Sequence, residues 1–202
     1  MSAFVARALD ATTWPEFARL VERHNGVWGG CWCMGFHPEG VGRSHTPEGN
    51  RDAKECRVRE GRAHAGLAFD GDICVGWCQF GSPDELPRIK HRRAYLQEAG
   101  EPPDWRITCF FVDRAHRGQG VASAALGGAL EQIARLGGGV VESYPEVVGD
   151  RKVSSSFLHN ATAELFEQHG FERTRQLGKH HWVVTKVVSA VPKPGSDPEL
   201  GS

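Results

Sequence analysis

The chain has 202 residues, the size of one ordinary domain with a single hydrophobic core. Its 24 lysines and arginines nearly balance 25 aspartates and glutamates, giving a net charge of −1, so no global positive field would recruit nucleic acid or an anionic membrane. No apolar run approaches the roughly 18 residues of a membrane span, and the N-terminus has no secretory pattern, so we expect a cytoplasmic protein.

The N-terminal part is predicted to contain two regular elements and a long loop. Residues 3–9 have the pattern of a strand, and residues 13–24 that of a helix capped by Thr13. A loop rich in Gly, Trp and Cys follows, and a polar helix is expected near residues 48–60. Long aromatic loops in compact domains are more often binding loops than linkers.

Six cysteines are scattered along the chain, which in a reducing compartment favours free thiols over a disulfide framework. The pairs Cys31/Cys33 and Cys74/Cys78 raise the question of zinc. Their C-x-C and C-x3-C spacings differ from the C-x2-C spacing of common zinc sites. We therefore expect no bound metal.

The middle of the chain is predicted to form a hairpin and a buried strand. Residues 63–81 are two apolar strands around Asp70-Gly71-Asp72, where Asp-Gly supplies the positive φ of a tight turn. Residues 82–104, with the basic run RIKHRRAY, are either a solvated loop with a short helix or a substrate lid. Residues 105–113, WRITCFFVD, are a continuous apolar strand of the type buried on both faces.

The C-terminal part alternates between helices and strands. Apolar residues at helical spacing predict a helix over 118–136, ended by three glycines, and residues 140–147 are the next strand. A short helix within 160–171 and two strands within 172–188 complete the fold. The tail 189–202 has too little apolar content to fold, so we expect it to be disordered.

The turn between the buried strand and the following helix has an unusual composition. It is basic and rich in glycine, and no Ser, Thr, Asp or Asn caps the helix. The first N–H groups of a helix and the positive end of its dipole attract anions. Gly118 and Gly120 let the backbone approach an anion, and Arg117 adds a forked donor. The turn therefore predicts a pyrophosphate site, with an ordinary glycine turn and solvated arginines as the alternative.

Two nucleotide-binding patterns fit this turn less well. The absence of Gly-Lys-Ser/Thr excludes a Walker loop. The dinucleotide fingerprint accommodates Gly118 and Gly120, with Glu142 as the ribose-binding acid. However, Ser123 replaces its third glycine, and five residues separate Val112 from Gly118 where a tight turn is expected.

A family resemblance rests on three segments. Residues 117–122, Arg-Gly-Gln-Gly-Val-Ala, match the R/Q-x-x-G-x-G/A signature of the GCN5-related N-acetyltransferases (GNAT), FFVD precedes them, and LFEQHGF downstream is similar to that family's LYEKxGF. The chain resembles the family over about residues 3–188. The resemblance implies a single domain, 1–188, of the α/β class, with a mixed sheet of six to seven strands splayed between strands four and five and flanked by helices.

The resemblance also implies a co-substrate, acetyl-CoA. Backbone groups of Phe111 and Val112 would pair with the pantetheine amides, as a peptide strand adds to an edge. The turn would hold the pyrophosphate through its N–H groups. The residues expected to bind acetyl-CoA are Phe111, Val112, Arg117, Gly118, Gln119, Gly120, Val121, Ala122 and Ser123.

The catalytic residues are less well marked. The tyrosine that the family often uses as general acid corresponds to Phe166, which has no proton to give. Glu142 and Tyr144 lie two residues apart on one face of the fifth strand and are candidates for base and acid. His159 and Thr162 are weaker candidates.

Four aromatic side chains are candidates to line the acceptor pocket: Trp28, Trp32, Phe36 and Trp77. We expect an acetyl-CoA-dependent N-acetyltransferase that modifies a primary amine of a small molecule or peptide by direct attack in a ternary complex. No nucleic acid or membrane partner is expected, and a homodimer is left open. One alternative is an acyl-CoA-binding sensor or partner module without turnover, and a second is a dinucleotide-dependent oxidoreductase.

Overall fold

The computed structural model describes residues 4–41, 46–98, 100–148 and 159–192. The strands are β1 (Val5–Ala8), β2 (His64–Asp70), β3 (Ile73–Gly81), β4 (Trp105–Val112), β5 (Gly139–Ser143), β6 (Glu172–Leu177) and β7 (His181–Val188). The helices are α1 (Trp14–Arg23), α2 (Pro47–Arg59), α3 (Arg92–Gln97), α4 (Val121–Arg135) and α5 (Ala163–Gln168), with two short 3-10 helices, η1 (Met34–Phe36) and η2 (Arg114–His116). The order and type of the helices and strands confirm the sequence prediction.

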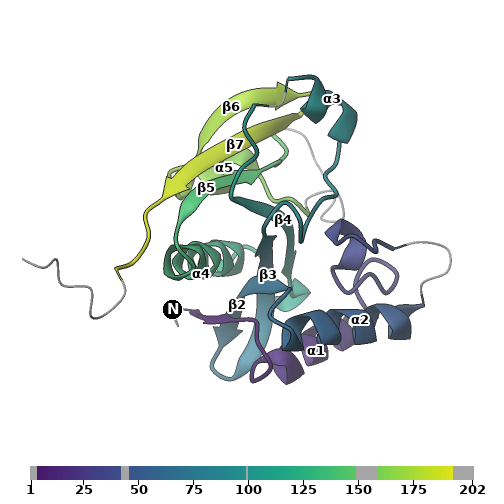
Figure 1. Cartoon of the computed structure of the whole chain (residues 1–202). Helices are drawn as coiled ribbons and strands as arrows, with labels where there is room; N and C mark the ends of the chain where they lie inside the picture. Colours follow the sequence, from purple (N-terminus) through teal and green to yellow (C-terminus); the bar gives the residue numbers. More distant parts are fainter. Residues whose placement is uncertain (1–3, 42–45, 99, 149–158, 193–202) are drawn as a thin grey trace, which may run out of the picture.

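All seven strands form one sheet in the order β1-β2-β3-β4-β5-β7-β6 (Figure 1). Neighbouring strands are antiparallel except for β4 and β5, which run parallel. The fold is therefore the mixed α/β sheet that the sequence predicts. None of the described helices is long and apolar enough to cross a membrane.

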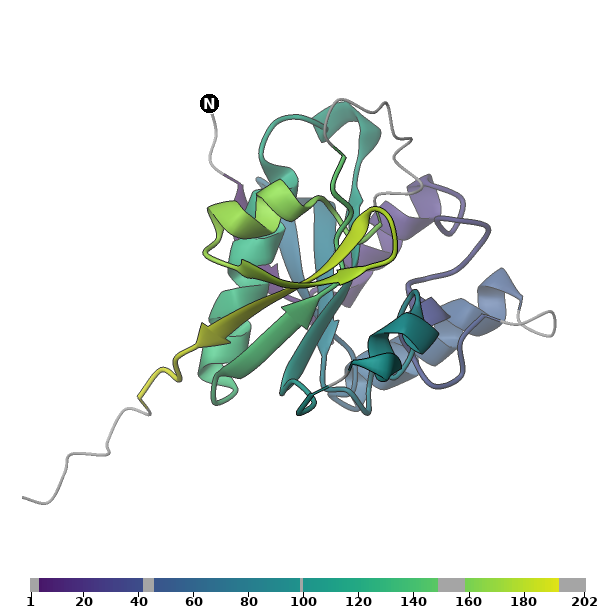
Figure 2. The ribbon, with the colours of Figure 1, turned by 90° about the horizontal axis from the view of Figure 1, so that it is seen from above.

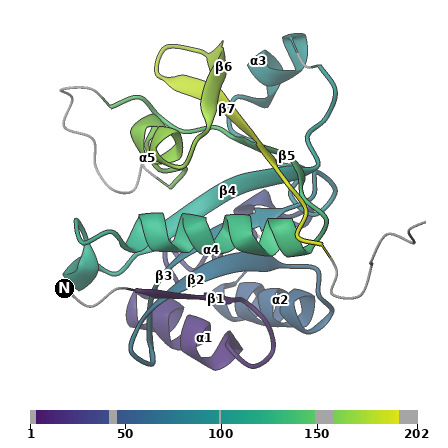
Figure 3. The ribbon, with the colours of Figure 1, turned by 90° about the vertical axis from the view of Figure 1, so that its left-hand side faces the viewer.

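Helices cover both faces of the sheet, with α4 on one face and α1 and α2 on the other (Figures 2 and 3). Helix α4 packs closely against the first strands because Gly66 of β2 has no side chain. A Cβ atom at Gly66 would lie 2.3 Å from the carbonyl oxygen of Ala125. This close packing fixes the position of α4 relative to the centre of the sheet.

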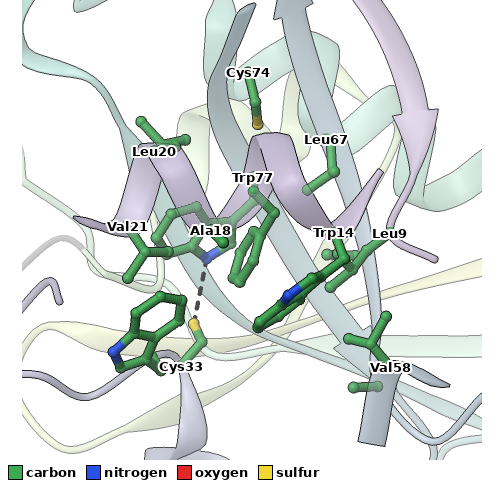
Figure 4. Close-up of a cluster of buried hydrophobic side chains, with 14 of the residues drawn as sticks. Leu9, Trp14, Ala18, Leu20, Val21, Cys33, Val58, Leu67, Cys74 and Trp77 are labelled. Atoms are coloured by element: carbon green, nitrogen blue, oxygen red, sulfur yellow. Dashed lines mark hydrogen bonds between the residues drawn. The ribbon is translucent and has the colours of Figure 1, made fainter. Parts of the chain in front are cut away.

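An aromatic cluster forms the core on the α1 face (Figure 4). The rings of Trp14 and Trp32 stack with centroids 6.0 Å apart, and Phe17 meets Trp77 edge to face at 5.0 Å. The indole N–H of Trp77 donates to the Sγ of Cys33 at 3.2 Å. These contacts attach the loop after α1 to β3, since Trp32 and Cys33 belong to that loop.

Helix α2, predicted as a polar helix, contains a buried lysine, Lys54. Lys54 Nζ donates to Gln79 Oε1 at 2.8 Å and lies 3.1 Å from His37 Nε2. Burial, followed by the charge of Lys54, lowers the pKa of His37 to about 2, so the ring is neutral and accepts this bond. Gln79 Nε2 in turn lies 3.3 Å from the hydroxyl of Thr108, which is the extra residue of a bulge in β4. The hydrogen-bond network of His37, Lys54 and Gln79 therefore stabilises the position of the bulge.

The expected splay between the fourth and fifth strands is present. Parallel pairing joins only Trp105–Ile107 of β4 to Val141–Ser143 of β5. Beyond this point β4 continues to Val112, and the Phe110 N–H donates to the carbonyl of His159 at 2.6 Å. The end of β4 thus faces a different segment of the chain.

Two local predictions were wrong. The fifth strand ends at Ser143 rather than near Val147, because Pro145 has no N–H to donate and the chain then turns toward α5. Thr13 occupies the N-cap position of α1, but its hydroxyl makes no capping bond and donates to the carbonyl of Ala8 at 2.6 Å.

Candidate active site

A cavity of about 680 Å³ follows the unpaired part of β4. Phe110, Phe111 and Val112 form its floor. The end of α1 and the loop after it, from Arg23 to Trp28, form one wall, and residues at the start of α5 form the other. The cavity therefore occupies the splay of the sheet.

A second cavity of about 320 Å³ lies at the N-terminus of α4. Gly118, Gly120 and the first residues of α4 line it. It shares Val112, Arg117 and Ala122 with the first cavity, along with one residue of α5. The two cavities therefore adjoin and form one cleft that runs from the splay to α4.

The N-terminus of α4 has no side-chain cap. By contrast, the hydroxyls of Thr46 and Thr162 cap α2 and α5. Gly120 stands at the N-cap of α4 with φ 92°, and Gly118 has φ 71°, conformations that favour glycine. The first N–H groups of α4 therefore adjoin the second cavity, as an anion site requires.

The charged residues along the cleft favour the binding of an anion at its α4 end. Arg114 and Arg117 line the cleft, and within the described parts of the chain neither forms an ion pair. Arg23 and His24, in contrast, lie 3.2 and 3.3 Å from Asp113. Burial raises the pKa of Asp113, but bonds from the Ala115 N–H, His24 and Arg23 outweigh burial and lower the pKa to about 2. Asp113 thus neutralises the α1 side and leaves the two turn arginines available.

The backbone of β4 presents Val112 rather than Phe111 to the cleft. The Phe110 N–H points to His159 and the Asp113 N–H points to Val75 of β3. Because backbone groups alternate along a strand, Val112 faces the same side as Phe110. Phe111 contributes its ring, which stacks on Trp77 with centroids 4.8 Å apart.

Glu142 and Tyr144 lie together, as predicted from their spacing, but in a closed network. Tyr144 and Tyr95 each donate a hydroxyl proton to Glu142 Oε2 at 2.8 Å. All three side chains are buried, and none lines either cavity. Burial, followed by the charge of Glu142, raises the pKa of Tyr144 far above its usual value, so this phenol stays protonated.

Phe166 is fully buried at the position where the family often has tyrosine. Its ring meets Phe110 at 5.8 Å and Phe171 at 5.0 Å, both edge to face. The side chain packs behind β4 rather than in the cleft. Phe166 is therefore a residue of the hydrophobic core.

The predicted acceptor residues fall into two groups. Trp28 is 39% exposed and lines the first cavity, and Trp28 and Phe36 both contact the ring of His159, with centroids 6.1 and 5.9 Å away. Trp32 and Trp77 are buried in the aromatic core and reach neither cavity. The splay thus brings Trp28, Phe36 and His159 together, while Trp32 and Trp77 support them from the core.

The loop that carries Trp28 has an unusual backbone. Asn25, Val27, Trp28, Trp32 and Cys33 all have positive φ values between 43° and 56°. Non-glycine residues rarely adopt this conformation, and it costs about 1 kcal/mol or more per residue. The aromatic core must hold this strained loop in place.

The remaining residues of the predicted turn have clear positions. Gln119 Nε2 donates to the carbonyl of Ala115 at 2.9 Å, and Ser123 Oγ lies 2.8 Å from His169 Nε2. Val121 is buried beneath the helix start, and Ala122 lines both cavities. Their side chains thus shape the turn and leave its N–H groups to the cleft.

Sequence reasoning missed several residues of the cleft. Arg114 is basic and lies in the predicted turn, so its charge was a usable signal. Phe110, Ala161 and Leu165 gave none, because apolar residues that line a cleft have the same pattern as core residues. In the part of the chain that the structure describes, no group of three or more His, Cys, Asp or Glu side chains could hold a metal ion.

The family model described as "Acetyltransferase (GNAT) family" matches residues 32–171, more than two thirds of the chain. The chain belongs to the GNAT family of acetyltransferases. It is therefore an acyltransferase, and the motif at residues 117–122 spans the turn and the uncapped start of α4. A search of curated proteins found no match.

Solved structures with the same fold include several acetyltransferases. A putative acetyltransferase, yncA, from Salmonella typhimurium, determined with its cofactor acetyl-CoA, is 15% identical, with a TM-score of 0.52 over 97% of this chain and 100% of that chain. An arylalkylamine N-acetyltransferase-like protein from mosquito is 15% identical, with a TM-score of 0.54 over 92% and 100%. A putative GNAT acetyltransferase from Desulfovibrio desulfuricans is 15% identical, with a TM-score of 0.52 over 93% and 100%. At this identity the likeness shows a shared GNAT fold.

Proposed function

We propose that this GNAT acetyltransferase transfers the acetyl group of acetyl-CoA to a primary amine, by direct attack in a ternary complex. The observation that carries the proposal is the uncapped N-terminus of α4, with Gly118, Gly120 and Arg117, at the end of a cleft along β4. A pyrophosphate would supply the missing cap. The presence of acetyl-CoA in the similar Salmonella structure supports the same co-substrate here.

The cleft has the parts that an extended thioester co-substrate needs. The N–H groups at the start of α4, with Arg114 and Arg117, would hold the phosphates. The backbone of Val112 would pair with a pantetheine amide, as an added strand does at a sheet edge. The thioester would then lie near Phe110, beside the rings of Trp28 and His159.

The reaction requires two proton transfers. A base first takes a proton from the acceptor ammonium, and the neutral amine nitrogen attacks the thioester carbon. The C–S bond then breaks as the amide forms, and the second amine proton passes to the departing thiolate. Glu142 and Tyr144 remain our candidates for base and acid, and reaching the substrate would require an opening of their network with Tyr95.

The competing function is an acyl-CoA-binding sensor or partner module without turnover. Phe166 favours this alternative, because it leaves the usual position of the acid without a proton donor. The cytoplasmic location and the absence of a metal, nucleic acid or membrane partner stay predictions from the sequence.

Turnover distinguishes these functions. We would incubate the protein with acetyl-CoA and a panel of primary amines and measure thiol release, with NADPH oxidation as a parallel assay. Amine-dependent thiol release is the expected result. Acetyl-CoA binding without release to any amine would favour the sensor, and NADPH oxidation would favour the oxidoreductase.

Two variants test the candidate catalytic residues. Glu142→Gln and Tyr144→Phe should lower kcat at least tenfold and leave the Kd of acetyl-CoA unchanged if these groups transfer protons. Tyr95→Phe is the matched control, since it removes the other hydroxyl bonded to Glu142. An equal loss in all three variants would mean that the network is structural.

A further inference from the structure

Two groups of surface cations have no carboxylate partner among the described residues. Most other exposed arginines are paired, as Arg59 is with Glu55 and Arg135 with Glu131. The first unpaired group, Arg114 and Arg117, faces the proposed phosphate site. The second group, which we call the α3 patch, consists of Lys90, Arg92, Arg93 and Lys179.

The α3 patch is a fixed surface rather than a set of separate loop side chains. Tyr95 of α3 donates to Glu142 of β5, and Arg175 Nη1 of β6 donates to the Tyr95 carbonyl at 3.0 Å. The rings of His91 and His181 lie 4.7 Å apart. These contacts hold α3 against the β6–β7 hairpin (Figure 1), and Lys179 belongs to the turn of that hairpin.

The patch lies close to the splay. His181 forms a backbone bridge with Glu146, and Glu146 forms another with Thr162, which lines the first cavity. Neighbouring strands are about 4.8 Å apart, so His181, whose ring contacts His91 just before α3, lies roughly 10 Å from Thr162. A molecule whose reacting group enters the cleft could therefore extend over the patch.

The surroundings of His181 show the sign of the local field. Burial, followed by the nearby charges of Lys90 and His91, lowers the pKa of His181 to about 4, against the opposing effect of Glu146. Lys90 and His91 thus both act on His181 as positive charges, although the net charge of the chain is −1.

We propose that the α3 patch binds an acidic segment of a polypeptide that carries the acceptor amine. This inference rests on the proposed acetyl transfer and names the class of acceptor. An extended peptide advances about 3.3 Å per residue, so carboxylates two to four residues from the amine would reach the patch. A nucleic acid fits less well, because a long polyanion is held by a continuous positive track, whereas the net charge of this chain is −1.

Binding is measured with two octapeptides that have a free amino terminus and a C-terminal fluorophore. One carries Asp and Glu from position 3 onward, and the other carries Asn and Gln at the same positions. With the protein saturated with CoA, fluorescence anisotropy should give a Kd at least tenfold lower for the acidic peptide. Raising NaCl to about 0.5 M should remove most of this preference, since salt screens exposed charges.

Charge reversal locates the site. The double variant Arg92→Glu/Arg93→Glu should raise the Kd of the acidic peptide at least tenfold and leave that of the neutral peptide unchanged. The control, Arg59→Glu/Arg135→Glu, makes the same change in net charge on α2 and α4 and should retain the preference. Equal loss in both double variants, or tighter binding of a single-stranded oligonucleotide than of the acidic peptide, would overturn the proposal.

Thiol release with the same peptides separates this proposal from the proposed function. The expected result is a lower KM for the acidic peptide, with the preference lost on reversal at α3. Acetylation of both peptides with equal KM would refute the acidic acceptor and retain the acetyltransferase. Specific binding of the acidic peptide without acetylation would retain the patch as a docking site and refute this peptide class as acceptor.

Discussion

The two edges of β4 differ in how far each is paired with the neighbouring strand. On the β3 edge the strand is paired from Arg106 to Val112, and Phe111 stacks on Trp77 within the aromatic core. On the β5 edge only three residues are paired, and Phe110, Phe111 and Val112 border the cleft. The closed edge depends on side-chain packing, whereas the open edge presents backbone groups and the uncapped end of α4.

This difference separates stability from binding. A substitution at the closed edge should lower the free energy of unfolding, because the core is close-packed and a smaller side chain would leave a cavity. A change at the open edge should alter binding with little effect on stability, because in the proposed function this edge binds the co-substrate.

Trp77→Ala should give the largest effect. Removing this buried indole should lower the free energy of unfolding by about 3–5 kcal/mol, as for other large-to-small core substitutions. Urea denaturation measures the change. Trp28→Ala is the control, because Trp28 also contacts Phe111 but is partly exposed and lies at the open edge. A similar loss of stability in both variants would contradict the proposed difference between the closed and the open edge.

Gly120→Asp should be the most damaging change at the open edge. A carboxylate at the start of α4 would repel a phosphate and compete for the N–H groups, so the Kd of acetyl-CoA should rise about 100-fold or more, about 3 kcal/mol. Calorimetry measures the affinity. The control is Gly137→Asp, since Gly137 also has a positive φ and open space around it but lies beyond the other end of α4. Unchanged affinity in Gly120→Asp would refute the anion site.

Arg117→Ala should weaken acetyl-CoA binding by about 1.5–3 kcal/mol, which corresponds to about 10- to 150-fold in Kd, because charge-assisted hydrogen bonds to phosphate are lost. Arg135→Ala, at the other end of α4, should leave the Kd unchanged. An unaltered affinity in Arg117→Ala would remove this residue from the phosphate site.

The smallest predicted effect is the dependence of the closed edge on pH. His37 stays neutral in the folded protein down to about pH 2, whereas in the unfolded chain it takes up a proton below about pH 6.5. The unfolded state then binds more protons, so stability should fall as pH decreases from 6.5, by about 1.4 kcal/mol per pH unit. Urea denaturation between pH 7 and 5 measures the slope. His37→Gln should show a smaller slope, and an identical slope would contradict the assigned neutral state.

The open edge could be predicted from the sequence because local backbone chemistry defines it. The sequence of residues 114–123 shows the two glycines, the basic turn and the absence of a capping side chain, and both glycines have positive φ in the structure. The closed edge and the acceptor side could not, since they join residues distant in the sequence. Tyr95 bonds to Glu142 across 47 residues, and Lys54 is buried within a helix whose composition is polar. The α3 patch likewise depends on how α3 packs against β6 and β7.

The central claim is that the open edge of β4 and the start of α4 bind acetyl-CoA. Calorimetric titration of the protein with acetyl-CoA, and separately with NADPH, tests it most directly. The account predicts one acetyl-CoA site that Gly120→Asp weakens about 100-fold or more, and no NADPH site. Absence of acetyl-CoA binding, or binding that Gly120→Asp leaves intact, would contradict it.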